Sequence, residues 1–459
     1  MEEQEKTLVE KALELIDEKK YASLRTLIID EEPADIAEIF EELSNEKTIV
    51  VYRLLPKELA AEIFVEMDTD KQENLINAFT DNELKAILDE LYYDDTADII
   101  EEMPATVVKR ILKNASSDMR KVVNELLKYP EDSAGSIMTT EFVRLRKSFT
   151  VQESIEYIRK VGIDKETIYT CYVADEKGHL IGIATAKDLL LASPEKTVEE
   201  VMDDHVISVA TLDDQEQIAF MFSKYDFLAL PVVDNENRLV GIITVDDAID
   251  VMQEETEEDF SKISAITPND TEYLKTSVFQ LWKSRIPWLL ILMLSATFTG
   301  IIISSFESAL AVLPILTAFI PMLMGTGGNA GSQASVTVIR GLSLDEIHLR
   351  DTLRVIWKEL RVSLLSGLTL MPIAFLKVMY LDGLFREEGG IRIALVISAT
   401  LFFIVVLAKL VGCVLPLIVK SVKLDPAVVA NPFITTIVDA LALIVYFALA
   451  SRLIPILMA

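Results

Sequence analysis

The segment "PFITTIVDALALIVYFALA" (residues 432–450) is apolar almost throughout, yet it carries one acid, Asp439, near its centre. An ionised acid in hydrocarbon is costly, and it usually faces the interior of a helix bundle or an aqueous path. A carboxylate in this position could therefore bind a cation that crosses a membrane. The alternative is a structural ion pair with Lys409, which lies in a neighbouring apolar stretch.

A second apolar stretch, "PMLMGTGGNAGSQASVTVIRG" (residues 321–341), combines four closely spaced glycines with the polar side chains of Asn329, Ser332 and Gln333. Irregular backbone at membrane depth is tolerated only where it is buried in protein or lines water. Helix packing is the alternative, because small residues are common at contacts between transmembrane helices. Glycines, amides and a separate carboxylate together favour a pore that handles cations.

Five apolar stretches reach the roughly 20 residues that a membrane-spanning helix needs. They cover about 286–306, 312–338, 362–380, 393–419 and 428–450. Lysine and arginine gather before the first stretch, between the second and third, and between the fourth and fifth. The positive-inside rule then predicts a cytoplasmic N-terminus and an external C-terminus. The opening residues "MEEQEKTLVE" lack the apolar core of a signal peptide, which also places the front of the chain in the cytoplasm.

Charge divides the chain into two unlike parts. Residues 1–274 hold 28 basic and 63 acidic side chains, whereas residues 275–459 hold 15 and 10. So negative a front repels nucleic acid and concentrates cations. The two cysteines and three histidines form no zinc-like spacing. We therefore expect no nucleic-acid partner.

The front of the chain repeats every twelve residues. "DIAEIFEEL" (35–43), "LAAEIFVEM" (59–67), "ELKAILDEL" (83–91) and "DTADIIEEM" (95–103) share the same apolar positions. Spacings of three and four place these positions on one face of a short helix. The pattern predicts an all-α, acidic helical-repeat domain over residues 1–130.

A second duplication follows in the middle of the chain. "GHLIGIATAKDLL" (178–190) matches "NRLVGIITVDDAI" (237–249) at a distance of 59 residues. Each unit is predicted to run helix, strand, strand, helix. The duplicated pattern resembles a tandem pair of CBS domains, here residues 131–200 and 201–254. The resemblance implies that Lys187 and Asp188 could contact a nucleotide such as ATP; closing a helix start is the other reading of this pair.

An acid-rich segment follows the second unit, at "TVDDAIDVMQEETEEDFSKI" (residues 244–263). Like charges at this density destabilise a helix, but hard divalent cations prefer carboxylate oxygens. Bound cations would let such acids approach other acidic surfaces, and their loss would drive the surfaces apart. We expect an acidic connecting helix over residues 255–280 before a transmembrane domain at 281–459; an exposed acidic linker is the alternative.

The order of parts resembles the MgtE family of bacterial magnesium channels and transporters. The order is acidic helical repeat, CBS pair, acidic linker and five spans, with "GTGGNAGSQ" in the second span and "DPAVVANPFITTIVD" in the last. The resemblance implies a multidomain membrane protein of the plasma membrane: a homodimer in the lipid bilayer, with Mg²⁺ as its ion and no enzyme activity. It also implies that cytosolic Mg²⁺ closes the pore through the acidic domains.

The resemblance assigns metal-handling positions in two places. At the pore they are Asp439, Thr435, Asn329, Asn431 and Gly325. In the cytosolic part they are Asp94, Asp95, Asp98, Glu216, Asp226, Asp247, Asp250, Glu255, Glu258 and Asp259. Two other classes remain as alternatives: a cation sensor with a mere membrane anchor, and a CBS-containing chloride channel, which would carry more spans and place its CBS modules last.

Overall fold

The computed structural model describes residues 7–268, 273–306, 314–386, 389–429 and 431–453. Side chains of residues 429, 431 and 453 are outside this description. The chain divides into two compact units, Met1–Met252 and Gln253–Ala459. Each unit is described by itself.

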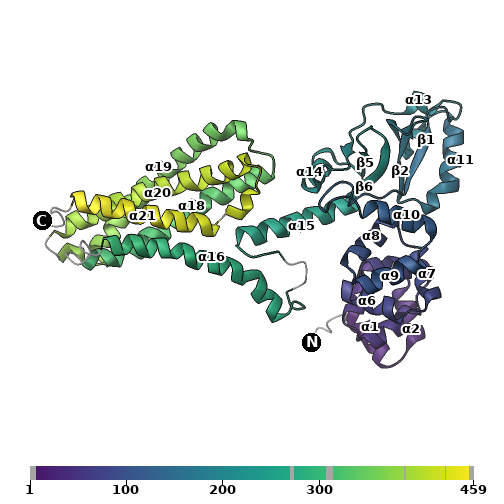
Figure 1. The fold of residues 1–459 in the computed structure, drawn as a ribbon, viewed down its shortest axis with the longest axis horizontal. Helices are drawn as coiled ribbons and strands as arrows, with labels where there is room; N and C mark the ends of the chain where they lie inside the picture. The colour runs from purple at the N-terminus through teal and green to yellow at the C-terminus, as the bar shows by residue number, and fades with distance from the viewer. Residues whose placement is uncertain (1–6, 269–272, 307–313, 387–388, 430, 454–459) are drawn as a thin grey trace, which may run out of the picture. The chain divides into compact units, whose positions relative to one another are not determined.

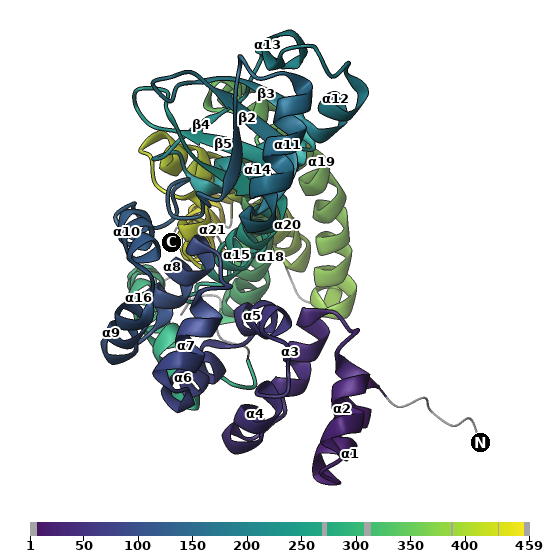
Figure 2. The same ribbon diagram turned by 90° about the vertical axis from the view of Figure 1, so that its right-hand side faces the viewer.

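The first unit begins with short helices set by the twelve-residue repeat (Figures 1 and 2). After α1 (Leu8–Asp17) and α2 (Tyr21–Ile28), eight helices start at residues 33, 45, 57, 69, 81, 93, 105 and 117. They are α3 (Pro33–Glu41), α4 (Asn45–Tyr52), α5 (Lys57–Val65), α6 (Thr69–Ala78), α7 (Asp81–Leu88), α8 (Tyr93–Glu102), α9 (Ala105–Asn114) and α10 (Ser117–Leu126). Helices two apart in this series pack together, as in α3 on α5 and α5 on α7. The predicted helical repeat is confirmed.

The repeat brings equivalent residues into contact. Phe40, Tyr52 and Phe64, twelve residues apart, pack edge to face with ring centroids 6.1 and 6.4 Å apart. The Tyr52 hydroxyl donates to the carbonyl of Ala60 at 2.6 Å, so its polar end is satisfied in the core. Burying each such aromatic side chain stabilises the stack by about 1.5–3 kcal/mol.

The CBS pair forms two three-stranded sheets with the same topology. The first predicted CBS domain contains β1 (Phe142–Arg146), α11 (Val151–Val161), β2 (Thr167–Ala174), β3 (Leu180–Thr185) and α12 (Ala186–Leu191). Helix α13 (Val198–Val201) leads to the second. The second contains β4 (Val209–Ala210), α14 (Gln215–Tyr225), β5 (Ala229–Val233), β6 (Leu239–Thr244) and α15 (Val245–Ile263). Each of these two domains therefore begins with a strand that the predicted helix–strand–strand–helix order lacks. Strand β1 pairs in parallel with β2, and β4 pairs in parallel with β5.

The acidic helix α15 begins at Val245, directly after β6, and ends at Ile263. Thr244 caps it, because its backbone N–H and its hydroxyl both donate to the carboxylate of Asp247. Residues 264–268 continue without helix, and residues 269–272 are outside the described range. The acids of residues 244–263 therefore lie on one continuous helix.

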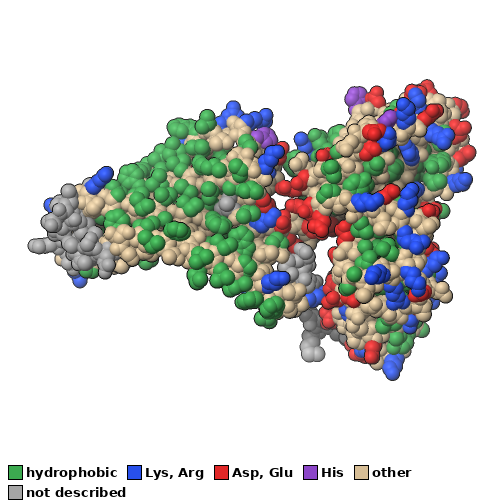
Figure 3. All heavy atoms as spheres, viewed as in Figure 1, with side chains coloured by type: hydrophobic (Ala, Val, Ile, Leu, Met, Phe, Trp, Pro, Cys, Tyr) green, Lys and Arg blue, Asp and Glu red, His purple; other side chains and the backbone are tan. Residues whose placement is uncertain are grey.

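The second unit is a bundle of long helices. They are α16 (Val278–Ser305), α18 (Ile320–Ser343), α19 (Thr352–Leu376), α20 (Gly390–Ser421) and α21 (Asn431–Leu453). Helix α18 packs on both α20 and α21, α19 packs on α20, and α16 packs on α21. Figure 3 shows hydrophobic side chains covering much of the surface of this unit, as a lipid-facing bundle requires.

Four described segments are long and apolar enough to cross a membrane: Val278–Ser305, Leu349–Leu381, Gly390–Ser421 and Pro432–Arg452. The predicted stretch that is not among these four, 312–338, corresponds largely to α18. The glycines and polar residues of this helix lower its mean hydropathy. A helical membrane region is thus present. Five spans were predicted, and four of the described helices are long and apolar enough to cross a membrane.

Candidate functional site

Seven carboxylates of the first unit influence one another's protonation. We call them the α8 carboxylate cluster. Its members come from helix α8, from the segments that precede β1 and β2, and from the start of α15. They are Asp94, Asp95, Asp98, Glu141, Glu166, Asp246 and Asp247.

Backbone hydrogen bonds hold the parts of this cluster together. The N–H of Tyr93, at the start of α8, donates to Oε2 of Glu141 at 2.9 Å. The N–H of Glu166 donates to the carbonyl of Glu141 at 2.9 Å. The first turn of a helix exposes unsatisfied N–H groups and favours negative charge. Glu141 therefore ties α8 to the first CBS domain.

Five members of the cluster are buried or half-buried, and the charges of Asp94 and Asp247 show why ionising them is costly. Burial and the neighbouring charge of Asp95 raise the pKa of Asp94 from 3.8 to about 7. Burial raises the pKa of Asp247 to about 7, and the charges of Asp94 and Asp246 add to this effect. A hydrogen bond from Thr244 to Asp247 acts in the opposite direction.

The same causes act on three further members of the cluster. Burial, followed by the charge of Asp247, raises the pKa of Asp95 to about 7. Burial and the charges of Asp94 and Asp95 raise the pKa of Glu166 to about 8. Burial by surrounding atoms and the same two charges raise the pKa of Asp98 to about 8, but its side chain is solvent-exposed and screening weakens this effect. At neutral pH the cluster is therefore only partly ionised, because full ionisation would crowd unfavourable negative charges together.

Two cluster oxygens are buried without a hydrogen-bond partner among the described residues: Oδ1 of Asp94 and Oε2 of Glu166. A buried polar atom without a partner costs free energy unless something fills its place. Crowded carboxylates with raised pKa values and free lone pairs are candidate ligands for a hard dication such as Mg²⁺. Among the described residues, however, the ligand atoms that already lie within 4.8 Å of one another belong to Asp203, Asp204 and His205, so the α8 carboxylates would have to move together to hold an ion.

Three other predicted acids of the first unit are exposed. Glu216 lies in the first turn of α14, and Asp226 ends α14 with φ +54°. Asp250 lies on α15, where burial and the charge of Asp246 raise its pKa. The structure therefore couples Asp94, Asp95, Asp98 and Asp247, links Asp250 to them through Asp246, and places Glu216 and Asp226 at the two ends of α14.

The end of α15 carries the last three predicted cytosolic acids, within the second unit. Nζ of Lys262 lies 2.6 Å from Oε2 of Glu258 and 2.7 Å from Oδ2 of Asp425. Burial and the charge of Asp425 raise the pKa of Asp259, which accepts a hydrogen bond from Ser343 at 3.2 Å. Glu255 lies on the same helix, half-buried. A lysine ammonium thus already neutralises part of this acidic group.

Asp439 lies on α21 and is half-buried. Its Oδ1 is buried and has no hydrogen-bond partner in the described part of the chain. Lys409, on α20, instead lines a cavity of about 620 Å³ with Gln333, Thr337 and Glu359. The ion pairs of the described residues do not include one between Lys409 and Asp439, so the structural ion-pair alternative finds no support.

The glycines of α18 divide between two faces of the helix. A Cβ on Gly328 would lie 2.9 Å from Cγ2 of Thr435, and one on Gly331 would lie 2.9 Å from Ile434 and 3.2 Å from the Ala408 carbonyl. These glycines, with Gly327, serve helix packing. Gly325 and Asn329 are instead exposed on another face, and a Cβ on Gly325 would meet nothing within 4 Å. The helix-packing reading is therefore confirmed for Gly327, Gly328 and Gly331. The pore reading stays a prediction for Gly325 and Asn329.

Asp188, one of the two predicted nucleotide contacts, serves a helix start in this structure. Thr185 and Asp188 form a reciprocal cap, in which the Asp188 N–H donates to the Thr185 hydroxyl at 3.1 Å. Lys187 and Asp188 are both exposed. Asn431 begins α21, but its side chain is outside the described range.

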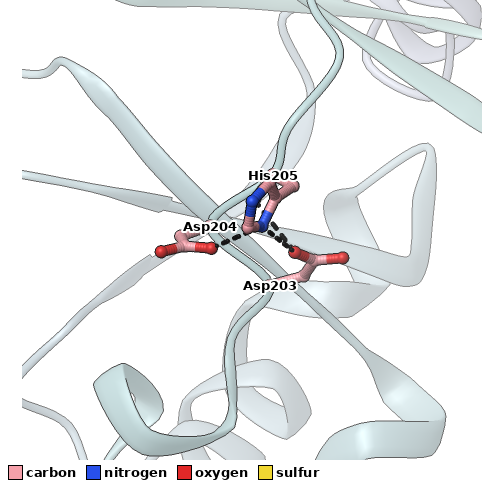
Figure 4. A group of neighbouring side chains, drawn as sticks. All are labelled: Asp203, Asp204 and His205. Atoms are coloured by element: carbon pink, nitrogen blue, oxygen red, sulfur yellow. Dashed lines mark hydrogen bonds and ion pairs between the residues drawn. The ribbon is translucent and has the colours of Figure 1, made fainter.

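One further group of potential metal ligands lies in the linker to the second CBS domain (Figure 4). The His205 ring approaches carboxylate oxygens of Asp203 at 3.6 Å and Asp204 at 2.8 Å. The three residues are consecutive and exposed. They form an ordinary surface ion pair, since no other element contributes a described ligand.

The sequence reasoning missed Glu141 and Glu166. Both stand in the first CBS domain where the second has a different residue type: the aligned positions are His205 and Tyr225. An acid that is present in only one copy of a duplicated fold is not required by that fold. This difference between the two repeats could have indicated that Glu141 and Glu166 have a functional role.

Comparison with known proteins fits this arrangement. The chain matches the family described as divalent cation transporter over residues 320–449, the MgtE intracellular N domain over 31–132, and CBS domains over 134–195 and 198–254. The magnesium transporter MgtE of Thermus thermophilus is 38% identical over 444 residues, 96% of this chain and 97% of its own length. The chain belongs to the MgtE family of magnesium transporters.

Other MgtE proteins agree with this assignment. The magnesium transporter MgtE of Bacillus subtilis is 32% identical over 97% of both chains. A crystal structure of the cytosolic domain of the Mg²⁺ channel MgtE in complex with ATP aligns with TM-score 0.50 at 38% identity, covering 53% of this chain and 99% of the solved one. The family moves ions across membranes and is not a family of enzymes.

Proposed function

We propose that this MgtE member is a homodimeric, five-span magnesium channel that cytosolic Mg²⁺ closes. The observation that carries the proposal is a set of three carboxylate oxygens that are buried without a hydrogen-bond partner among the described residues. One belongs to Asp439 on the membrane helix α21, and two belong to Asp94 and Glu166 of the α8 carboxylate cluster. A dication bound at each of these two places would give the buried oxygens a partner.

The pore part of the proposal depends on how weakly Mg²⁺ gives up its water. Magnesium keeps several waters and is usually held by one or two carboxylates. Asp439 from each of two subunits, helped by the Thr435 carbonyl, would hold the hydrated ion without stripping it. Gly325, Asn329 and Asn431 would line the approach. Weak, multi-site holding permits release, and membrane potential favours entry by about 2.3 kcal/mol per charge per 100 mV.

The gate depends on the electrostatics of the cytosolic unit. Without a metal, ionisation of the α8 carboxylate cluster opposes the packing of α8 on the CBS pair. Bound Mg²⁺ reverses this, and α15 would transmit the change to the membrane domain. Glu258 and Asp259, with Asp425, would take part at the far end of α15. A nucleotide such as ATP would bind near Lys187 and Asp188, where it would replace the present helix cap.

The proposal places the chain in the plasma membrane, with the N-terminus in the cytoplasm and the C-terminus outside. The competing function is a cation sensor that the membrane part only anchors. A pure anchor has no use for a half-buried acid whose buried oxygen lacks a partner, because such an acid is costly in hydrocarbon.

The test is growth and Mg²⁺ uptake in a bacterial strain that depends on added magnesium. Wild-type protein should support growth at low magnesium, and Asp439→Asn should abolish it at equal membrane abundance. Asp382→Asn is the matched control, because Asp382 is paired with Lys377 at 2.9 Å and has no predicted role in the pore. Full growth with Asp439→Asn would refute the pore assignment.

A further inference from the structure

A cavity of the first unit, about 920 Å³ in volume, lies at the end of the first CBS sheet. It is bordered by the last residues of β1 and by the turn between β2 and β3. In the β2–β3 pair, Thr170 is opposite Thr185, whereas Ala174 is opposite Leu180. The cavity therefore lies at the other end of β2 from the cap of Thr185 and Asp188.

Cations dominate the lining of this cavity. Arg144, Arg146, Lys147 and Lys177 line it and are exposed. Val143 and Leu145, the alternate residues of β1, are fully buried in the domain core. The strand's alternation thus requires apolar residues on one face but leaves the opposite face free to carry any polar residue.

Two acids, Asp175 and Glu176, line the cavity beside the four cations and balance only part of their charge. Asp175 accepts backbone hydrogen bonds from Lys177 and His179 at 2.8 and 2.9 Å, and it contacts Nδ1 of His179 at 2.8 Å. These contacts, the one with the His179 ring foremost, lower the pKa of Asp175 to about 2. Its charge is therefore engaged within the turn. Lys147 pairs with Glu199 at 3.1 Å on the surface, which is a weak, exchangeable contact.

The turn is shaped to admit one of the arginines. Gly178 has φ +96°, and a Cβ added there would lie 2.9 Å from Nη2 of Arg144. Glycine lets the guanidinium lie against the turn backbone at the cavity rim. The equivalent residue of the second CBS domain is Asn237, so the fold also accepts a side chain at this position.

The second CBS domain is an internal control for the charge. Its residues Ser208, Ala210, Thr211 and Glu236 align with Arg144, Arg146, Lys147 and Lys177. The same fold thus forms without any of the four cations. Concentrating them in one repeat of a region with 63 acids and 28 bases is not explained by folding or by solubility.

We propose that this cavity binds a small soluble anion that carries two or more phosphate groups. Arginine presents a planar fork of donors that matches phosphate oxygens, and lysine adds point charge. Four cations around about 920 Å³ offer more charge and room than a single phosphate uses. The site is separate from the nucleotide position proposed near Asp188, and it does not depend on the pore.

The experiment is calorimetric titration of sodium tripolyphosphate into the full chain in detergent micelles, with EDTA and without divalent ions. The main variant carries the residues of the second repeat: Arg144→Ser, Arg146→Ala and Lys147→Thr together. The matched control makes the same charge change on exposed helix positions, Lys109→Ser, Arg120→Ala and Lys121→Thr. Lys177→Glu is a single-residue alternative that follows the second repeat at position 236.

We expect saturable binding that weakens at least tenfold in the cavity triple variant and in Lys177→Glu. Binding should change less than twofold in the control triple variant. Three results would overturn the proposal. They are no saturable binding, equal losses in the two triple variants, or equal binding of sulfate, which would indicate general charge screening.

Discussion

Replacing Asp94 by asparagine should stabilise the packing of α8 in the absence of metal and remove much of its response to Mg²⁺. The reason is the cost of the charge. Burial and the neighbouring Asp95 raise the pKa of Asp94 from 3.8 to about 7. At 1.36 kcal/mol per pKa unit, ionising Asp94 at high pH costs on the order of 4 kcal/mol. Asparagine keeps the shape of the side chain and removes that cost.

Bound metal acts in the opposite way on the wild type. A ligand present at 100 times its dissociation constant stabilises the state that binds it by about 2.7 kcal/mol. This lowers the population of locally opened α8, and with it the exchange rate of its amides, by about a hundredfold. Wild-type α8 should therefore open readily in EDTA and resist opening in Mg²⁺. The Asp94→Asn variant should open at least tenfold more slowly than wild type in EDTA, and Mg²⁺ should add little further protection.

Hydrogen exchange measures this directly, because local opening free energies differ between elements of one protein. The readout is amide exchange in residues 93–102 of the full chain at pH 8, in EDTA and in excess Mg²⁺. Asp35→Asn is the matched control, since Asp35 is an exposed acid in the first turn of α3. A variant that exchanges faster than wild type in EDTA, or that keeps the full Mg²⁺ response, would refute the reasoning.

Three further predictions use the same structure. In the metal-free wild type, the protection of α8 amides against hydrogen exchange, corrected for intrinsic exchange, should fall as pH rises from about 4 to 8 and then level off. The reason is that the pKa values of Asp94 and Glu166 are raised in the packed state, which therefore binds more protons than the open state in that pH range. In membrane patches, Asp247→Asn should raise the cytosolic Mg²⁺ needed for half-closure, and exposed Asp250→Asn should raise it less; equal shifts would argue against the cluster as the sensor. Gly412→Ala should destabilise the membrane bundle by roughly 1–3 kcal/mol, because its Cβ would overlap the Gly331 carbonyl, whereas Gly325→Ala should be tolerated; thermal unfolding in detergent compares the two.

Periodicity predicted most of the architecture, because local patterns of apolar residues determine which face of a helix or strand is buried. The twelve-residue interval predicted the helix starts from residue 33 to residue 117. The duplicated glycine turn predicted two similar α/β units. The leading strands β1 and β4 were missed, since β4 is only two residues long and carries little pattern of its own.

The candidate site was only partly predictable. Acids are abundant along the front of the chain, so their number could not separate ligands from solvated surface. The resemblance to the MgtE family assigned Asp94, Asp95 and Asp98, which lie on one helix. Spacing along the chain could not add Glu141 and Glu166, which approach α8 from segments 48 and 72 residues away from Tyr93 and Asp94, respectively.

The sequence by itself determined which segments are apolar, which repeat, and where charge collects, because these properties belong to residues and their near neighbours. Tertiary structure alone decided which of many similar acids are desolvated together and which glycines of α18 meet another helix. Desolvation and close packing depend on atoms that distant segments bring into contact, and that information is not present in any local stretch of the chain.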